Sequence, residues 1–361
     1  MFKFSELKSI HLEVTNNCQA SCPMCSRNIN GGLDNPLLKV NSWSLDDFKT
    51  VMSVEVLQQI QSFYFCGNFG DPILNDDLIE MCKYTQDTAP QITVRIHTNG
   101  GARKTKWWAD LARSLNPNHN VIFALDGLSD THSIYRIGTN FETILRNAKA
   151  FIDAGGKAEW CFIKFKHNEH QVEQAQAMAQ ELGFHKFTLK NSSRFILEPR
   201  HPVMNKNGET IYFIEPSGDT KLTFIDRKVL DSYKTIMDNS KVECFAQNVK
   251  EIYIDAYKNV FPCCWLASTP YNYISDLDPA SSIRFEINKQ YYDLIRSLGD
   301  IDSVNAIKNT ISDIIDNDSW QTVWDEYWTT KKLITCVRTC GVGSNFSKPK
   351  DQFIEVLNLN E

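Results

Sequence analysis

Short apolar runs alternate with amphipathic segments of helical length along the first half of the chain. Six runs have the length and composition of strands, namely residues 10–14, 62–66, 93–97, 121–125, 158–165 and 186–190. Helical patterns fill the gaps between them. This alternation is typical of βα units around a parallel sheet. We therefore predict an α/β fold with six such units over residues 1–190.

The helical segments carry recognisable start and stop signals. Residues 44–59 begin at Ser44, with Asp47 three positions later, which is a capping box with Asp in place of Glu. The pattern over residues 141–154 ends at two glycines, and that over residues 169–182 ends at Gly183. We expect one helix over each of the three ranges.

The regular alternation ends near residue 191. Residues 194–239 contain several prolines, Gly-Asp and Asn-Gly turns, and short apolar runs at 211–214 and 222–225. We interpret residues 191–240 as a linker that carries a hairpin, and residues 241–361 as a smaller α+β domain. In that domain a stripe of tryptophans at helical spacing predicts core or interdomain packing rather than a ligand site, through Trp320, Trp324 and Trp328.

The composition is that of a soluble globular protein, with 42% hydrophobic and 23% charged residues. The N-terminus carries charges where a signal peptide needs an apolar run, and no long uncharged apolar segment follows, so we expect a cytoplasmic protein without membrane contact. A net charge of −6 disfavours a broad phosphate-binding surface. We interpret Arg194, Arg200 and Lys206 as a solvated face, although a basic groove there would favour nucleic acid.

Eleven cysteines are many for a reducing compartment, which favours metal ligation or catalysis for those that cluster. Cys18, Cys22 and Cys25 follow the first predicted strand with the spacing C-x3-C-x2-C, in a segment called here the cysteine loop (residues 13–27). Three thiolates on one loop can hold a soft metal centre: zinc, copper(I) or an iron-sulfur cluster. A structural zinc site needs four ligands, whereas three leave one position open.

The cysteine loop resembles the cluster-binding loop of the radical S-adenosylmethionine (radical SAM) enzymes. The resemblance implies that Cys18, Cys22 and Cys25 hold a [4Fe-4S] cluster. The amino and carboxylate groups of S-adenosylmethionine would then chelate the fourth iron. Met24 departs from the family pattern, in which an aromatic residue commonly precedes the last cysteine. An apolar side chain there can still shield the cluster.

Three further segments resemble the family and lie after successive predicted strands. The glycine loop (residues 66–74) is similar to the family's Gly-Gly-Glu-Pro segment, the third strand ends in Thr-Asn-Gly, and the fourth runs into Asp-Gly with an Arg downstream. Ordinary turns, and a surface salt bridge for Arg136, are the alternatives. Parallel βα architectures gather their sites at these strand ends, which supports a partial (β/α)6 TIM-like barrel. The resemblance assigns S-adenosylmethionine to Gly67, Gly70, Asp71, Pro72, Thr98, Asn99, Asp126 and Arg136.

Five cysteines return in the predicted second domain. Their arrangement resembles the SPASM or shorter twitch extension, which binds an auxiliary [4Fe-4S] cluster. The implied ligands are Cys244, one of Cys263 and Cys264, Cys336 and Cys340. Three residues separate the last two cysteines, where the family more often has two. Zinc on the same thiolates, or a second cluster with a different additional ligand, remain alternatives.

The resemblance implies an enzyme that cleaves S-adenosylmethionine reductively and removes hydrogen from a peptide or small-metabolite substrate. An external one-electron reductant, similar to flavodoxin or ferredoxin, would be its partner. If an auxiliary cluster accepts an electron, the net reaction would be an oxidation or a crosslink. Modification of a nucleotide or nucleic acid is the second hypothesis. A redox-sensing module that binds a cluster without turnover is the third.

Overall fold

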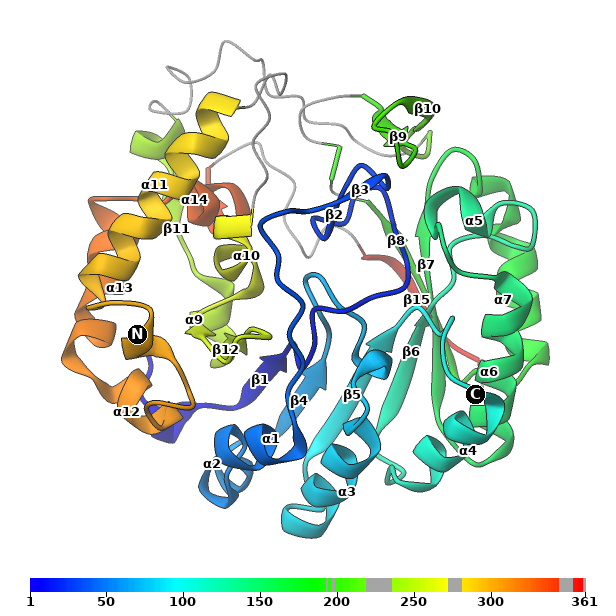
Figure 1. The fold of residues 1–361 in the computed structure, drawn as a ribbon, viewed down its shortest axis with the longest axis horizontal. Coiled ribbons are helices and arrows are strands. Elements are labelled where there is room, and N and C mark those ends of the chain that lie inside the picture. Colours follow the sequence, from blue (N-terminus) through cyan, green and yellow to red (C-terminus); the bar gives the residue numbers. More distant parts are fainter. Residues whose placement is uncertain (193, 196–198, 219–235, 272–280, 344–352, 360–361) are drawn as a thin grey trace.

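A single nine-stranded sheet forms the centre of the molecule (Figure 1). The computed structural model describes residues 1–192, 194–195, 199–218, 236–271, 281–343 and 353–359. The strand order is β13-β12-β1-β4-β5-β6-β7-β8-β15, with β12 through β8 parallel and the two outer strands antiparallel to their neighbours. Six parallel strands confirm the predicted units, as β1 (Ser9–Leu12), β4 (Ser62–Phe65), β5 (Thr93–Thr98), β6 (Asn120–Ala124), β7 (Ala158–Lys164) and β8 (Lys186–Asn191).

Helices cover the outer face of these strands (Figure 1). They are α1 (Leu45–Val51), α2 (Val54–Gln59), α3 (Leu78–Thr88), α4 (Thr105–Arg113), α5 (His132–Tyr135), α6 (Phe141–Asp153) and α7 (Val172–Glu181). The prediction of one helix over 44–59 is wrong. Helix α1 ends at Val51, and the hydroxyl of Ser53 caps a new helix by accepting a hydrogen bond from the Val56 amide. The predicted capping box at Ser44 and Asp47 is present.

The two faces of the sheet differ sharply in polarity. Side chains at alternate strand positions face the helices, and they are apolar and almost fully buried: Ile10, Leu12, Phe63, Phe65, Val94, Ile96, Val121, Phe123, Trp160, Phe162, Phe187 and Leu189. The remaining positions line the inner face and are largely polar. They include His11, Tyr64, Arg95, His97, Glu159 and Lys190. The core therefore lies between sheet and helices, and the inner face is left for ligands.

The predicted linker does contain a hairpin, in which β9 (His201–Met204) pairs with β10 (Thr210–Ile214). The range 211–214 is thus a strand as expected. The expected strand at 222–225 lies outside the described residues. A proline within β9 is compatible with pairing because this strand is an edge of a two-stranded sheet.

Strands from the C-terminal third extend the sheet of the first half. Strand β12 (Glu251–Ile254) pairs with β1, β13 (Val260–Phe261) pairs with β12, and β15 (Phe353–Asn358) pairs with β8. The other elements are α9 (Phe245–Val249), α10 (Cys264–Ala267), α11 (Ser281–Ser297), α12 (Ile311–Asp316), α13 (Asp318–Thr329) and α14 (Ile334–Cys340). The division at residues 190 and 240 stays a prediction, since the sheet crosses it.

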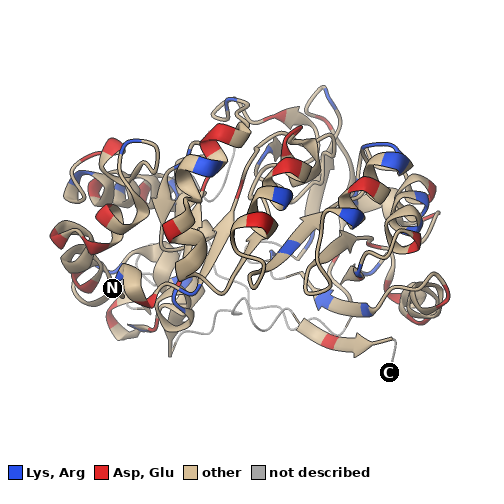
Figure 2. Ribbon diagram, turned by 90° about the horizontal axis from the view of Figure 1, so that it is seen from below, with Lys and Arg blue, Asp and Glu red and all other residues tan. Residues whose placement is uncertain are grey.

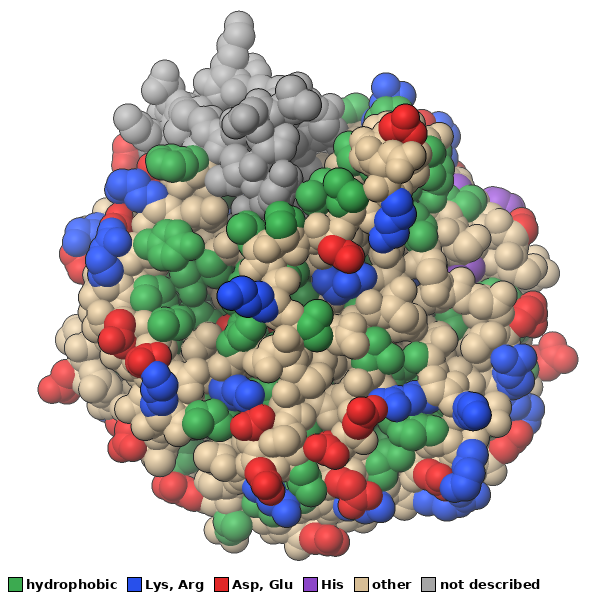
Figure 3. All heavy atoms as spheres, viewed as in Figure 1, with side chains coloured by type: hydrophobic (Ala, Val, Ile, Leu, Met, Phe, Trp, Pro, Cys, Tyr) green, Lys and Arg blue, Asp and Glu red, His purple; other side chains and the backbone are tan. Residues whose placement is uncertain are grey.

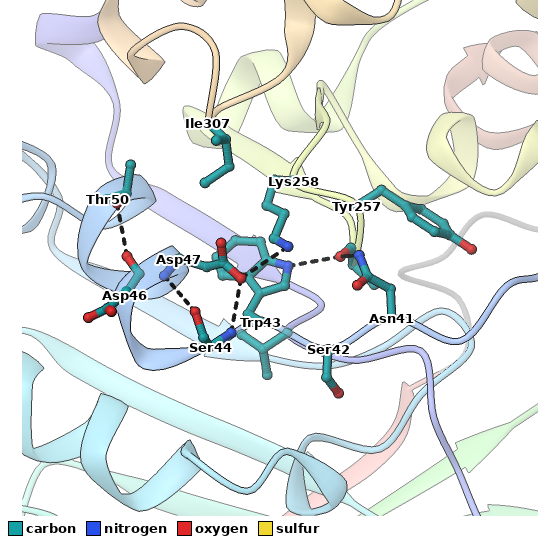
Figure 4. Close-up of polar contacts among 12 residues, drawn as sticks. Asn41, Ser42, Trp43, Ser44, Asp46, Asp47, Thr50, Tyr257, Lys258 and Ile307 are labelled. Carbon is teal, nitrogen blue, oxygen red and sulfur yellow. Dashed lines mark hydrogen bonds and ion pairs between the residues drawn. The ribbon is translucent and has the colours of Figure 1, made fainter.

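The turn between β12 and β13 docks on the segment before α1 (Figure 4). The Trp43 indole donates to the carbonyl oxygen of Ala256 over 3.0 Å, and the Lys258 ammonium lies 3.1 Å from a carboxylate oxygen of Asp47. Asp47 therefore serves both the cap of α1 and this contact. In the described part of the chain, no helix combines the length and apolar character needed to cross a bilayer.

Candidate active site and a second cysteine cluster

The three cysteines of the cysteine loop lie where the predicted ligand segments meet. The amide of Asn99 points at the Cys18 sulfur over 3.5 Å, and Arg136 Nη1 lies 3.8 Å from the sulfur of Cys22. The Cys25 sulfur lies 3.8 Å from the carbonyl oxygen of Asn68 in the glycine loop. The structure thus brings together the segments that the sequence placed after four different strands.

The protein environment by itself disfavours thiolates at this loop. Burial raises the pKa of Cys18 and of Cys22 above the usual range, and only the Arg136 charge clearly opposes the shift at Cys22. A bound metal centre supplies the positive charge that such buried thiols need to ionise. The donor set therefore fits an iron-sulfur cluster with three protein ligands.

The glycine loop packs directly against the backbone of the cysteine loop. A Cβ atom on Gly70 would lie 1.9 Å from the carbonyl oxygen of Thr15, and one on Gly67 would lie 2.4 Å from the carbonyl oxygen of Gly70. Glycine is required at position 70 because the backbones of the two loops approach so closely there, and at position 67 because the glycine loop folds back on its own backbone. This contact fixes the distance between the two loops.

Glu13 holds the glycine loop through hydrogen bonds to its backbone. Its Oε1 accepts hydrogen bonds from the amides of Phe69 and Gly70, at 2.7 and 3.0 Å, and its Oε2 accepts one from the Tyr253 hydroxyl at 2.6 Å. Burial raises the pKa of Glu13 to about 7, against the opposing effect of these hydrogen bonds. Tyr253 belongs to β12, so the C-terminal third helps to build the site.

Asp71 stands where the family has Glu, and it binds protein groups. Its Oδ2 accepts from the Asn99 amide at 2.7 Å and from the Thr98 hydroxyl at 3.1 Å. Burial raises the pKa of this carboxyl to about 6, although the hydrogen bonds oppose the shift. Pro72 begins a short 3-10 turn directly after it. Asp71 therefore ties the glycine loop to the end of β5.

Asp126 and Arg136 form a buried ion pair beside Cys22. The Arg136 Nε lies 2.5 Å from Asp126 Oδ2, and the two side chains are 16% and 0% exposed, so the pair is no surface salt bridge. The Ile163 amide donates to the other Asp126 oxygen at 2.6 Å. Burial opposes the Arg136 charge, but the Asp126 carboxylate raises the pKa of this guanidinium well above its usual value.

The β9-β10 hairpin and the segment before it cover the cysteine loop. The Arg194 guanidinium donates to the carbonyl oxygen of Met24, His201 bonds the carbonyl oxygen of Pro23 at 3.0 Å, and Lys206 donates to that of Gly32 at 2.8 Å. Met24 itself is buried. Two of the three basic residues considered for a nucleic-acid groove therefore hold the hairpin on the loop.

A second group of cysteines surrounds a cavity in the C-terminal third, called here the C-terminal cavity. Its lining includes four cysteines and three tryptophans, namely Cys244, Cys263, Cys336, Cys340, Trp265, Trp324 and Trp328. Trp265 lies in α10, the other two tryptophans lie in α13, and Cys336 and Cys340 lie in α14, whereas Cys244 and Cys263 directly precede α9 and α10. Cys264 is not among the lining residues. Burial raises the pKa of its thiol, and Cys66 in the barrel adds to the shift.

The predicted packing role of the tryptophan stripe is only part of what the structure shows. Trp320 and Trp324 are buried in the core as expected. Trp324 and Trp328, however, also line the C-terminal cavity. Their indole N-H groups are buried without an oxygen or nitrogen partner among the described residues. Burial raises the pKa of the Cys336 thiol, and a hydrogen bond from the Trp328 indole opposes the shift. Buried indole donors beside four sulfurs suit a group that carries acceptors.

All eleven cysteines are free thiols in the structure. Within the described ranges, no group of three or more His, Cys, Asp or Glu side chains is placed to hold a single metal ion. Cys82, a residue of α3, is fully buried in the core. Cys66 and Cys161 instead lie on the inner face of the sheet.

Several residues of the site did not stand out in the sequence. Glu13 and Tyr253 form the anchor of the glycine loop, and Gln19 holds Asn99 through a hydrogen bond of 2.6 Å. Glu13 was detectable as a lone carboxylate at the end of an apolar strand, directly before the cysteine loop. Tyr253 carried no signal, because its role depends on the pairing of β12 with β1.

Comparison with known proteins supports this arrangement. Residues 12–186 match the sequence model of the radical SAM superfamily. No curated protein sequence matches the chain.

Among solved structures, the fold is similar to SuiB of Streptococcus suis bound to the precursor peptide SuiA, with a TM-score of 0.54 and 13% identity over 88% of this chain. The chain spans 66% of that SuiB chain, just under two thirds. It is also similar to native anSMEcpe with bound AdoMet, with a TM-score of 0.52 and 15% identity over 96% of this chain and 92% of that one. A complex of anSMEcpe with AdoMet and the Kp18Cys peptide gives a TM-score of 0.51 at 15% identity, covering 97% and 93% of the two chains.

These similarities establish the fold, and the family match covers the cysteine loop, the glycine loop and the strand ends described above. Residues 12–186 therefore match the radical SAM superfamily, whose enzymes use a [4Fe-4S] cluster and S-adenosylmethionine.

Proposed function

We propose that this protein is a radical SAM enzyme that oxidises or crosslinks a peptide or small metabolite. The observation that carries the proposal is the convergence of the glycine loop, Asn99 and Arg136 on the three thiols of the cysteine loop. Cys18, Cys22 and Cys25 would hold the cluster. The chemistry supplied by the bound group is one-electron cleavage of S-adenosylmethionine to methionine and a 5′-deoxyadenosyl radical.

The chain's own residues would bind and orient the sulfonium compound. Glu13 and Asp71 hold the glycine loop in place, so its backbone would meet the methionine amino group without rearranging. Arg136 lies beside Cys22 and keeps guanidinium N-H groups for a carboxylate, because only its Nε serves Asp126. Thr98 and Asn99 would border the ribose.

The C-terminal cavity would hold an auxiliary [4Fe-4S] cluster on Cys244, Cys263, Cys336 and Cys340. Cys263 is preferred over Cys264 because it lines the cavity. The buried indole N-H groups of Trp324 and Trp328 suit the sulfides or thiolates of a cluster as acceptors. Such a site near the barrel supports an electron-accepting role, hence a net oxidation. An external flavodoxin- or ferredoxin-like reductant would supply electrons.

Two of the similar structures contain a bound peptide, SuiA in SuiB and Kp18Cys in anSMEcpe, which supports a peptide substrate for this protein. Modification of nucleic acid receives less support. Arg194 donates to the carbonyl oxygen of Met24 in the cysteine loop, and Lys206 donates to that of Gly32 just beyond it. Basic and acidic residues are interspersed along the ribbon of Figure 2 and over the face seen in Figure 3. Salt-dependent binding of RNA or DNA would instead favour that hypothesis.

Iron and sulfide analysis of anaerobically reconstituted protein tests the proposal. Two [4Fe-4S] clusters would give about eight irons per chain. Replacing Cys18, Cys22 and Cys25 together by Ala should remove about half, and replacing Cys244, Cys336 and Cys340 should remove the other half. Iron content unchanged in the first variant, or zinc alone in the wild type, would refute the assignment.

A further inference from the structure

The side chain of Asn68 connects the glycine loop to the chain beside the C-terminal cavity. Its Nδ2 donates a hydrogen bond to the carbonyl oxygen of Cys264 over 2.8 Å. Cys264 is the first residue of α10, and Cys263 directly before it lines the C-terminal cavity. The acceptor of Asn68 therefore belongs to the residue next to a proposed cluster ligand.

The main chain of Asn68 contacts the first cysteine site. Its carbonyl oxygen lies 3.8 Å from the sulfur of Cys25. The next two amides along the loop, those of Phe69 and Gly70, donate to the buried carboxylate of Glu13. Asn68 thus lies between the two cysteine sites, with its backbone on one and its side chain directed to the other.

A second set of contacts accompanies this hydrogen bond. The ring of Tyr271, shortly after α10, packs edge to face against the ring of Phe69, with 5.2 Å between the centroids. The Tyr271 carbonyl oxygen accepts from the buried amide of Asn35 at 2.8 Å, and the same amide donates to the carbonyl oxygen of Ser26 at 2.8 Å. Residues 264–271, called here the α10 segment, therefore touch both the glycine loop and the end of the cysteine loop.

The start of the α10 segment depends on the cavity for its position. Helix α10 has four residues, too few to be held by its own hydrogen bonds, and Leu266 and Ala267 fix its C-terminal end in the core. Its N-terminal end follows Cys263. The other lining cysteines belong to α14 and to the residue before α9, which are distant in the sequence. A group bound by all four thiolates would tie the start of α10 to these elements.

We propose that Asn68 is a positioning residue through which occupancy of the C-terminal cavity strengthens the binding of S-adenosylmethionine. The inference rests on the proposed function, because it takes a cluster on the cavity cysteines and the sulfonium compound at the glycine loop. Ligation fixes the start of α10, and the Cys264 carbonyl then holds Asn68 and the loop in the binding position. Without that group, part of the binding energy is used to order the loop.

Binding of S-adenosylmethionine to four anaerobically reconstituted proteins tests this inference. Equilibrium dialysis without reductant measures the affinity while no cleavage occurs. The proteins are the wild type, Asn68→Ala, a triple variant with alanine at Cys244, Cys336 and Cys340, and the combination of all four changes. Asn68→Ala and the triple variant should each bind about tenfold more weakly than the wild type, a typical size for coupling between two sites. The combination should bind no more weakly than the triple variant, because the connection is already lost.

Independent roles of the two sites would give a different result. If Asn68 merely supported the fold of the loop, the two losses would multiply to about a hundredfold in the combination, which would overturn the inference. Unchanged affinity in the triple variant would overturn it as well.

Asn116→Ala is the matched control. The Asn116 amide also donates to a carbonyl oxygen, that of Pro90 at 3.0 Å, but in the connections that precede β5 and β6, at the opposite end of the strands. This variant should bind S-adenosylmethionine as the wild type does. An equal loss of affinity in Asn116→Ala would contradict a specific role of Asn68.

Hydrogen exchange followed by mass spectrometry gives a readout that does not depend on ligand binding. Amides of the glycine loop should exchange faster in the triple variant than in the wild type. Asn68→Asp keeps the size of the side chain but replaces the donor by an acceptor, so its loop should exchange as fast as that of the triple variant. Equal protection of the loop in wild type and triple variant would argue against the coupling.

Iron content separates this inference from the proposed function. Asn68→Ala should retain the wild-type iron content, so that its loss of affinity reflects the loop rather than a missing cluster. A wild type with about eight irons and the same affinity as the triple variant would refute the coupling alone. About four irons in the wild type, or no binding of S-adenosylmethionine to it, would refute the proposed function and the coupling with it.

Discussion

Arg136 and Asp126 are joined by a contact of 2.5 Å between Nε and Oδ2, with the Asp126 side chain fully buried and the sulfur of Cys22 on the far side of the guanidinium. The pair links the end of β6 to the cysteine loop. Among the described residues, Arg136 is the one cation that forms an ion pair with Asp126.

Arg136→Gln should destabilise the protein by about 3 to 5 kcal/mol, because it leaves the Asp126 charge buried and unpaired. Adding Asp126→Asn should recover part of that loss, so the two changes will not be additive. Urea unfolding of the anaerobic protein measures both effects. Arg113→Gln removes an exposed ion pair on α4 and should cost less than about 1 kcal/mol. Equal effects of the two arginine variants would contradict the pairing.

Gly70→Ala should destabilise the protein by about 3 kcal/mol or more and prevent cluster assembly, because the new Cβ would overlap the Thr15 carbonyl oxygen. Gly218→Ala is the control. Its Cβ would meet nothing closer than a Glu169 oxygen at 3.9 Å, and it should unfold at the wild-type urea concentration. Normal stability and iron content in Gly70→Ala would show that the two loops do not pack as described.

Glu13→Gln should change how stability depends on pH. The folded protein raises the pKa of Glu13 from 4.5 to about 7, so the folded state binds this proton more tightly than the unfolded state does. Glu13 therefore contributes a stability that is present at low pH and is lost as the pH rises from about 4.5 to 7. Glutamine keeps the oxygen that accepts from Phe69 and Gly70 and cannot ionise.

The difference in unfolding free energy between Glu13→Gln and wild type should accordingly shift by about 2 kcal/mol in favour of the variant between pH 5 and pH 8. Urea titrations at the two pH values give this number. A difference that stays constant with pH would mean that Glu13 titrates normally in the folded protein.

Cys263→Ala should remove the auxiliary cluster, and with it about half of the iron, whereas Cys264→Ala should retain the full iron content. The reason is that only Cys263 lines the C-terminal cavity with the other three cysteines. Iron analysis after identical anaerobic reconstitution compares the two variants. Loss of iron in Cys264→Ala, with full iron content in Cys263→Ala, would show that Cys264 is the ligand and contradict the assignment.

The six parallel strands were predictable because each is a short apolar run bounded by turn signals, and the cysteine loop was predictable because its spacing is local. The three motifs downstream were also placed correctly beside it, since parallel strands end at one edge of a sheet. The spacing of residues within one loop and the common direction of strands in βα units can both be derived from a sequence.

Contacts between distant segments were not predictable. The pairing of β12 with β1 brings Tyr253 to Glu13, across 240 residues, and no periodicity records it. The break between α1 and α2 depends on one serine cap inside an apolar pattern that reads as continuous. The choice between Cys263 and Cys264 required the direction of each side chain, which adjacent positions in a sequence do not reveal.

The most direct measurement is the yield of 5′-deoxyadenosine from S-adenosylmethionine when the anaerobically reconstituted wild-type protein is given a strong one-electron reductant. The account predicts formation of this product by the wild type, and none by protein in which Cys18, Cys22 and Cys25 are alanine. Absence of the product with an intact cluster, or its undiminished formation by the alanine variant, would contradict it.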